Sequence, residues 1–271
     1  MPPSPPTDAI QKEILRRLHA LETREHVAVL YACESGSRAW GFASTNSDYD
    51  VRFIYTRRLD WYLSIDEGRD VIEAPILDDI DVSGWDLRKA LQLLRKSNPP
   101  LLEWIQSPII YRQQADFSQR FRKLANAFYS PKACVYHYLH MAEGNARHYF
   151  QKKSVQRKKY LYVLRPILAC EWIEAGHGLA PIEFDRLVER MVPAGPVRDA
   201  IEDLIERKKR GEELDEGPKI TILDEFIEKE ITRLRGLADQ FPCPEAAVEP
   251  LNEFFRSIVR GHGGTMPLPP T

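Results

Sequence analysis

Two aspartates separated by one residue are the side chains in this 271-residue chain best placed to do chemistry. Asp48 and Asp50 open the run DYDVRFIY (48–55), which has the composition of a strand. Alternation along a strand would place both carboxylates on the same face, one pleat repeat apart. Such carboxylates repel each other unless one is protonated or a cation lies between them. Because Mg²⁺ is held by one or two carboxylates together with substrate phosphates, the spacing predicts a divalent metal site.

A glycine–serine turn lies about ten residues before the two aspartates. The apolar run VAVLYAC (27–33) predicts a buried strand that ends at Ser35-Gly36-Ser37. Gly36 permits close backbone approach and Ser37 adds a hydroxyl, so this turn could hold a phosphate. An anion site facing two carboxylates would suit phosphoryl or nucleotidyl transfer. Taken alone, the D-x-D pattern is also compatible with a solvated edge strand, and the G-S pair with an ordinary turn.

A third predicted strand, DIDVSGW (79–85), is also acidic. Asp79 and Asp81 are both candidates for a third carboxylate at the same site. Two arginines flank the first two acids. Arg38 follows the glycine–serine turn and could reach a terminal phosphate, whereas Arg52 is predicted on the strand face of Asp50 and could pair with a carboxylate or a phosphate.

This order of motifs resembles the nucleotidyltransferase superfamily of the DNA polymerase β type, and within it the RNA-repair-pathway DNA polymerase β family. The resemblance lies in GSRAWGFASTNSDYDVRFIY (36–55) and WDLRKALQLLRKSNPPLLEWIQSPIIY (85–111), and it covers roughly residues 27–170. It implies an α+β fold with a mixed sheet and flanking helices, followed by an all-helical C-terminal region. It favours Asp81 over Asp79, because Asp81 stands five residues before Asp86 of the D-L-R-K segment.

The resemblance implies a metal-dependent enzyme that transfers an NMP group from an NTP, ATP among the candidates, to an acceptor hydroxyl and releases pyrophosphate. An RNA end is one candidate acceptor. Asp48, Asp50 and Asp81 would be catalytic and would hold Mg²⁺ or Mn²⁺, and Gly36 and Ser37 would bind the phosphates. Two alternatives stay open: a non-catalytic nucleotide-sensing module on the same fold, and a toxin–antitoxin-type enzyme that nucleotidylates a partner protein.

Residues 144–170 contain seven Lys or Arg residues and no Asp or Glu. Tyr149, Tyr160 and Tyr162 lie among them, and this mixture suits a polyphosphate or a nucleic-acid backbone. The stretch also resembles the family's helical K-x-x-x-x-x-R element, which makes Lys159 and Arg165 candidate nucleotide ligands together with Arg38. The alternative is a solvated basic face balanced by the acidic helix predicted at 199–216.

The elements that must position these residues follow from hydrophobic periodicity. Strands are predicted at 27–35, 48–56 and 79–85, and helices at 8–22, after an N-cap at Thr7, and at 86–97. Beyond about residue 115 the pattern is helical and predicts no strand. The predicted organisation is a nucleotidyltransferase catalytic domain at 7–113, a helical domain at 114–262, and Pro/Gly-rich tails at 1–6 and 263–271.

The composition excludes several other protein classes. Hydrophobic residues make up 43% and charged residues 29% of the chain, which is a globular rather than a disordered mixture. The four cysteines contain no C-x-x-C pair, so neither a zinc ribbon nor a thioredoxin motif is present. No apolar run approaches the roughly 18 residues of a membrane helix, and the first ten residues do not resemble a secretory signal. The expected location is therefore cytoplasmic.

Overall fold

The computed structural model describes residues 6–114, 116–150, 154–211 and 216–262, in two compact units. We call residues 6–36, 48–128 and 245–262 the sheet unit. The described residues of 37–47 and 129–244 form the helical unit. The predicted tails lie outside the described residues, except for Pro6.

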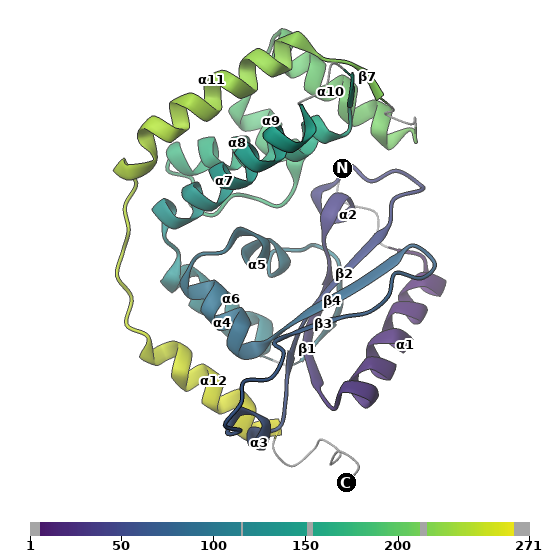
Figure 1. Ribbon diagram of the computed structural model, residues 1–271, viewed down its shortest axis with the longest axis vertical. Helices are drawn as coiled ribbons and strands as arrows, with labels where there is room; N and C mark the ends of the chain where they lie inside the picture. Colours follow the sequence, from purple (N-terminus) through teal and green to yellow (C-terminus); the bar gives the residue numbers. More distant parts are fainter. Residues whose placement is uncertain (1–5, 115, 151–153, 212–215, 263–271) are drawn as a thin grey trace. The chain divides into compact units, whose positions relative to one another are not determined.

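The sheet unit contains a five-stranded mixed sheet in the order β3-β4-β2-β1-β5 (Figure 1). The central strand, β2, pairs in parallel with β4, and the other three pairs are antiparallel. The predicted mixed sheet is thus confirmed, and the interpretation of the D-x-D segment as an edge strand is wrong, because β2 is flanked on both sides. The strands are β1 (Ala28–Glu34), β2 (Tyr49–Thr56), β3 (Val71–Glu73), β4 (Ile80–Asp86) and β5 (Ile110–Gln113).

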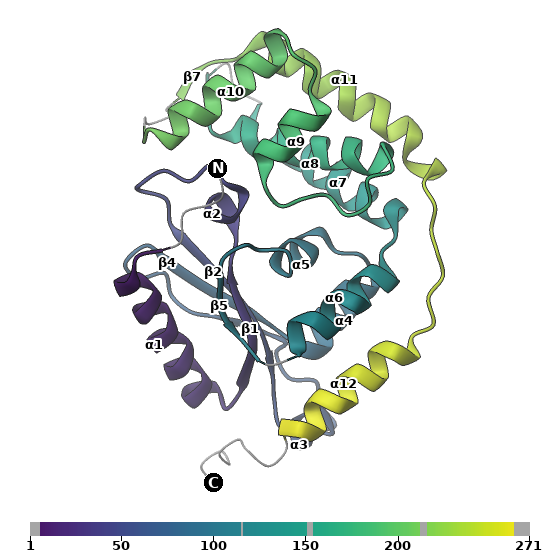
Figure 2. The ribbon, with the colours of Figure 1, turned by 180° about the vertical axis from the view of Figure 1, so that it is seen from behind.

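Helices cover both faces of this sheet (Figures 1 and 2). Helix α1 (Asp8–Glu25) buries Ile14, Leu18 and Leu21 against one face, in a core shared with strand residues such as Val51. Thr7 caps α1 as predicted, since its Oγ1 accepts a hydrogen bond from the Ile10 amide (3.5 Å). The opposite face is covered by α4 (Leu87–Arg95) and α6 (Phe117–Phe128), with α5 (Pro99–Trp104) between them in sequence.

The C-terminal helix α12 (Glu249–His262) belongs to the sheet unit. Its Phe255 ring lies 5.0 Å from the ring of Tyr62 in α3 (Leu59–Tyr62), in an edge-to-face contact. The Tyr62 hydroxyl donates to Asp86 (2.7 Å), which is fully buried and also accepts from the Arg88 amide (2.8 Å) at the start of α4. Burial raises the pKa of Asp86, but these two donors keep its carboxyl group hydrogen-bonded.

The helical unit is built around the pair α7 (Pro131–Tyr149) and α8 (Lys159–Glu174). It further contains α9 (Phe184–Met191), α10 (Pro196–Lys209), α11 (Thr221–Leu237) and the 3₁₀ helix η1 (Ala238–Gln240). The prediction that the C-terminal region is all helical is wrong at one place, because β6 (Ser154–Gln156) pairs with β7 (Glu216–Pro218). The rest of the described region is helical or loop. Strands of three residues are too short to show the alternation by which strands are recognised in a sequence.

Glu171 of α8 and Glu230 of α11 form a carboxyl pair between these two helices. Glu230 of α11 is buried and accepts a hydrogen bond from Arg233 (2.6 Å), which also donates to Glu174 of α8 (2.6 Å). Burial, and then repulsion from Glu230, raise the pKa of Glu171 from 4.5 to about 8. The folded protein therefore holds a proton on Glu171 near neutral pH that the unfolded chain lacks.

This pair predicts a pH-dependent stability. Between about pH 4.5 and 8 the folded state binds more protons than the unfolded state, so the free energy of unfolding should fall as pH rises through this window. We expect the melting temperature to drop by several degrees between pH 5 and 8.5, and Glu171→Gln to flatten that dependence. Glu228→Gln, at an exposed position of α11, is the control. An unaltered pH profile in Glu171→Gln would contradict the assignment.

Candidate active site

The parallel pairing of β2 and β4 brings two of the predicted acids together. Asp50 and Asp81 are register partners on the two strands. The Nη2 atom of Arg52 donates to Oδ1 of Asp50 (3.0 Å) and to Oδ2 of Asp81 (2.7 Å). The side chains of Asp50 and Asp81 are 30% and 29% exposed. Two carboxylates thus share one guanidinium at a position that solvent reaches.

Gly36 lies directly against one of these carboxylates. A Cβ atom added to Gly36 would stand 2.0 Å from Oδ2 of Asp50, and Gly36 has φ +58°, which L side chains rarely adopt. The neighbouring Ser35 amide donates to the Asp50 carbonyl (2.8 Å). Both the close approach and the backbone conformation therefore require glycine where β1 ends.

The other two acids occupy different surroundings. Asp48 is exposed and lies one residue before β2 rather than within it. Asp79 is exposed in the turn before β4, with φ +58°, and its carbonyl accepts from the Tyr49 amide (2.7 Å). Of the two candidates for the third acid, Asp81 is the one that shares Arg52 with Asp50.

Sequence reasoning missed a buried acid at this end of the sheet. Glu34, the last residue of β1, has no exposed surface. Its carboxylate accepts hydrogen bonds from the Asp50 amide (2.8 Å) and from the Tyr111 hydroxyl, and its carbonyl accepts from Ser107 Oγ (2.6 Å). Glu34 therefore ties the backbone of Asp50 to β1 and β5. The only sequence signal was a glutamate directly after an apolar run, and such a residue is ordinarily expected in solvent.

The residues after Gly36 form the five-residue helix α2 (Gly36–Trp40). Ser37 is buried, and its carbonyl accepts from the Phe42 amide (3.1 Å). Arg38 donates through Nη2 to the Ser47 carbonyl (2.6 Å), and this bond closes the segment between the glycine–serine turn and Asp48. The predicted roles of Ser37 and Arg38 in nucleotide binding stay predictions.

Within the helical unit, cations of α8 contact aromatic rings. Lys159 Nζ lies 4.6 Å from the ring centroid of Tyr149 and 5.4 Å from that of Tyr162, within the range of cation–π interaction. Arg165 is 2% exposed, lies 4.7 Å over the Trp40 ring, and donates to the Ile182 carbonyl (3.3 Å). Arg165 thus packs against the segment that follows Gly36, and its predicted phosphate contact stays a prediction.

Two lysines of the basic stretch, Lys152 and Lys153, lie outside the described residues.

Aromatic contacts join residues 37–47 to the other described residues of the helical unit. Trp40 meets Tyr162 edge-to-face (5.5 Å), and Phe42 meets Phe184 in the same manner (5.6 Å). The 37–47 segment therefore packs as part of the helical unit, although it joins two strands of the sheet.

A divalent metal ion fits the donor set of this site. Among residues 6–114, 116–150, 154–211 and 216–262, no three His, Cys, Asp or Glu side chains form a ready metal cage. Mg²⁺, however, needs only one or two carboxylates and completes its shell with water and substrate phosphates. Asp50 and Asp81 supply two such carboxylates side by side, and solvent reaches both of them.

In sequence, this chain is similar to a known protein family. The model of the RNA repair pathway DNA polymerase beta family matches residues 10–257. A Bacillus subtilis (strain 168) protein described as "Uncharacterized protein YcgL" is 48% identical over 231 residues, which are 85% of this chain and 89% of that protein. A solved nucleotidyltransferase-like protein from Exiguobacterium sibiricum 255-15 matches at 12% identity and TM-score 0.30, over 92% of this chain and 80% of its own. That TM-score is too low to support a conclusion. No helix in the described part of the chain has the length and apolar character needed to span a membrane.

Proposed function

Because this chain belongs to the RNA repair pathway DNA polymerase beta family, we propose that it is a metal-dependent nucleotidyltransferase. It transfers an NMP group from an NTP to an acceptor hydroxyl. The acceptor oxygen bonds to the α-phosphorus, the bond between that phosphorus and the α–β bridging oxygen breaks, and pyrophosphate leaves. The observation that carries this proposal is the pairing of Asp50 with Asp81 on parallel strands beside Gly36.

Asp48, Asp50 and Asp81 would hold Mg²⁺ or Mn²⁺. When bound, the ion supplies a Lewis acid that polarises the triphosphate and lowers the pKa of the attacking hydroxyl. Asp81 would help to accept the proton of that hydroxyl. Arg52 would keep the Asp50 and Asp81 carboxylates in position, because its one Nη2 atom already contacts both. Glu34 would keep the Asp50 backbone in place through the Asp50 amide.

The experiment that tests the proposal follows an α-phosphate label. The protein is incubated with each α-³²P-labelled NTP, with Mg²⁺ or Mn²⁺ and with total cell extract, and the product is digested with RNase or with protease. Label sensitive to RNase would identify an RNA acceptor, and label sensitive to protease would identify the partner protein of a toxin–antitoxin-type enzyme. Nucleotide binding without labelled product or pyrophosphate release would favour the nucleotide-sensing alternative and contradict transfer.

An RNA acceptor is the candidate that the basic, tyrosine-containing stretch at 144–170 favours. A triphosphate needs only two or three cations, whereas this stretch has six Lys or Arg besides the buried Arg165, with no Asp or Glu among them in the sequence, and this number suits a longer phosphate backbone. Tyr149 and Tyr162 are partly exposed and offer stacking surfaces for bases, whereas Tyr160 is buried. We expect log affinity for single-stranded RNA to fall with log salt at about 0.7 per phosphate contact. The Lys152/Lys153/Arg157/Lys158→Glu variant should flatten this slope. Identical salt profiles for the two proteins would remove RNA from the candidates.

The proposed role of Ser37 gives a separate prediction. Its hydroxyl on a phosphate would contribute about 0.5–1.5 kcal/mol, so Ser37→Ala should raise the KM for NTP by roughly twofold to twelvefold with little change in kcat. Ser64→Ala, which removes an exposed hydroxyl from the sheet unit, is the control. Melting temperatures of both variants separate lost binding from lost folding. Equal KM values in wild type and Ser37→Ala would show that Ser37 does not bind the triphosphate and only forms part of the turn.

A further inference from the structure

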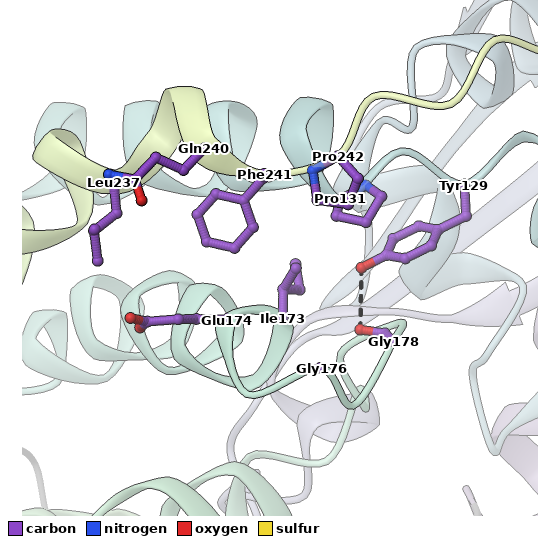
Figure 3. A pocket seen from close by; sticks show the side chains of 10 residues that line it. All are labelled: Tyr129, Pro131, Ile173, Glu174, Gly176, Gly178, Leu237, Gln240, Phe241 and Pro242. Carbon is purple, nitrogen blue, oxygen red and sulfur yellow. Dashed lines mark hydrogen bonds between the residues drawn. The ribbon is translucent and has the colours of Figure 1, made fainter.

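The helical unit contains a cavity that shares no residue with the carboxylate site (Figure 3). It has a volume of about 440 Å³ and lies between the C-terminal end of α8 with the loop that follows it and the segment running from the end of α11 to Pro242. This volume is within the range of about 300–1,000 Å³ that is typical of sites for small organic ligands.

The middle of the cavity is apolar. The Phe241 ring extends toward Ile173 of α8, with Leu237 on one side of it and Pro131 and Pro242 on the other (Figure 3). Tyr129 closes the far end, where its hydroxyl donates to the Gly178 carbonyl (3.1 Å). These side chains provide an apolar enclosure with two aromatic rings, which suits a flat or slender apolar group.

The charge of the lining has a single sign. Among the described residues that line the cavity, Glu174 is the one charged residue, and no Lys, Arg or His is found. Its carboxylate and the amide of Gln240 lie at the same end of the cavity, opposite Tyr129 (Figure 3). The Glu174 side chain is 32% exposed, and its Oε1 accepts from Arg233. A ligand anion would meet no cation in this lining, whereas a ligand cation would meet a carboxylate.

Glu174 belongs to a larger group of charged residues on α8 and α11. Glu174, Glu171 and Glu230 form one group, against which Arg233 and the exposed Lys229 are the cations. Glu171 keeps its proton at neutral pH because burial and the neighbouring acid disfavour its ionisation, so the group has two carboxylates and two cations and is close to neutral as a whole. The preference for a positive charge therefore depends on the Glu174 carboxylate itself, which is part of the cavity lining.

We propose that this cavity binds a small organic cation, in which an ammonium group is carried on an aromatic or aliphatic body. The ammonium group binds the Glu174 carboxylate and the Gln240 amide oxygen, and the body packs on Phe241 and Ile173. Aromatic ring faces also attract cations, so Phe241 and Tyr129 add to the preference for this charge. The inference is independent of the proposed nucleotidyl transfer, because it uses residues of the helical unit alone.

The test compares three probes of nearly equal size and different charge: 2-phenylethylammonium, 2-phenylethanol and phenylacetate. Binding to the full-length protein is measured by ligand-observed NMR and calorimetry. The cation should bind at least about tenfold more tightly than the alcohol, and phenylacetate more weakly than either. Glu174→Gln should reduce the affinity for the cation to that for the alcohol, while the affinity for the alcohol stays the same.

Two further variants keep this test decisive. Phe241→Ala should weaken binding of both the cation and the alcohol, because it removes the apolar contact that they share. Glu143→Gln removes an acid that pairs with Arg235 elsewhere in the helical unit, and it should change nothing. The proposal is overturned if phenylacetate binds as tightly as the cation, if no probe binds, or if Glu174→Gln and Glu143→Gln bind the cation equally well in their folded states.

Discussion

Asp50→Asn is expected to lower nucleotidyl transfer by about a thousandfold or more, equivalent to roughly 4 kcal/mol of transition-state stabilisation. Asparagine keeps the shape of the side chain but removes the charge that would hold the metal ion. Folding should be preserved or slightly improved, because the repulsion between Asp50 and Asp81 is relieved while Arg52 still meets Asp81. Pyrophosphate release with each NTP and with Mg²⁺ or Mn²⁺ is the measurement, alongside melting temperature. Asp48→Asn and Asp81→Asn should behave in the same way.

The chain offers a matched control two residues before Asp81. Asp79→Asn makes the same chemical change in an exposed turn with φ +58°, a conformation that asparagine tolerates well. Asp79→Asn should therefore retain near wild-type activity. Loss of activity in Asp79→Asn but not in Asp81→Asn would exchange the roles of the two acids. A folded Asp48→Asn/Asp50→Asn double variant with normal activity would refute the proposed metal site altogether.

Gly36→Ala is expected to have the second largest effect, a loss of about a hundredfold in transfer with weakened use of the triphosphate. The added methyl group would stand 2.0 Å from Oδ2 of Asp50, so the carboxylate must leave its position. The left-handed backbone at φ +58° adds a strain of about 1–2 kcal/mol for any L residue. Gly36→Val, with a larger and branched side chain, should be worse. Steady-state kinetics with NTP and thermal unfolding measure the two effects.

A substitution at Gly41 separates the effect of backbone strain from the effect of displacing the Asp50 carboxylate. It also has a positive φ (+88°), but no atom lies within 4 Å of the position that its Cβ would take. Gly41→Ala should therefore carry the backbone strain without displacing a carboxylate, and so lower stability more than it lowers kcat. If Gly36→Ala and Gly41→Ala reduce transfer equally, the close approach to Asp50 has no functional importance.

The local pattern of the chain was sufficient for the framework of the site. Apolar runs and their periods place β1, β2, β4 and α4 to within one or two residues, because each element has a continuous buried face that leaves a repeating signal. Thr7 and Asp86 mark helix starts, since a capping side chain acts on amides only two or three residues away. The order of turn and acids along the chain also led to the correct family.

Contacts between residues far apart in the chain could not be predicted from the local sequence pattern. Glu34 and Tyr111 are 77 positions apart in the sequence. The hydrogen bond between them, which satisfies the buried Glu34 carboxylate, forms only because β5 pairs with β1. The helix α12 lies in the sheet unit through contacts such as that of Phe255 with Tyr62. A periodic pattern shows that a helix face is buried, but it does not identify the surface that buries it.

The strand that carries Asp50 shows what the local sequence predicts and what depends on the tertiary structure. Residue types and spacing are sufficient to predict that Asp50 lies on a buried strand beside a glycine turn, because both depend on neighbours in the chain. The pairing of Asp50 with Asp81, and not with Asp79, depends on the register of two parallel strands. A shift of one residue in that register would turn the side chains of β4 to the opposite face, and only the packing of the whole sheet selects one register. Arg52 can contact both acids because that packing places Asp50 and Asp81 side by side.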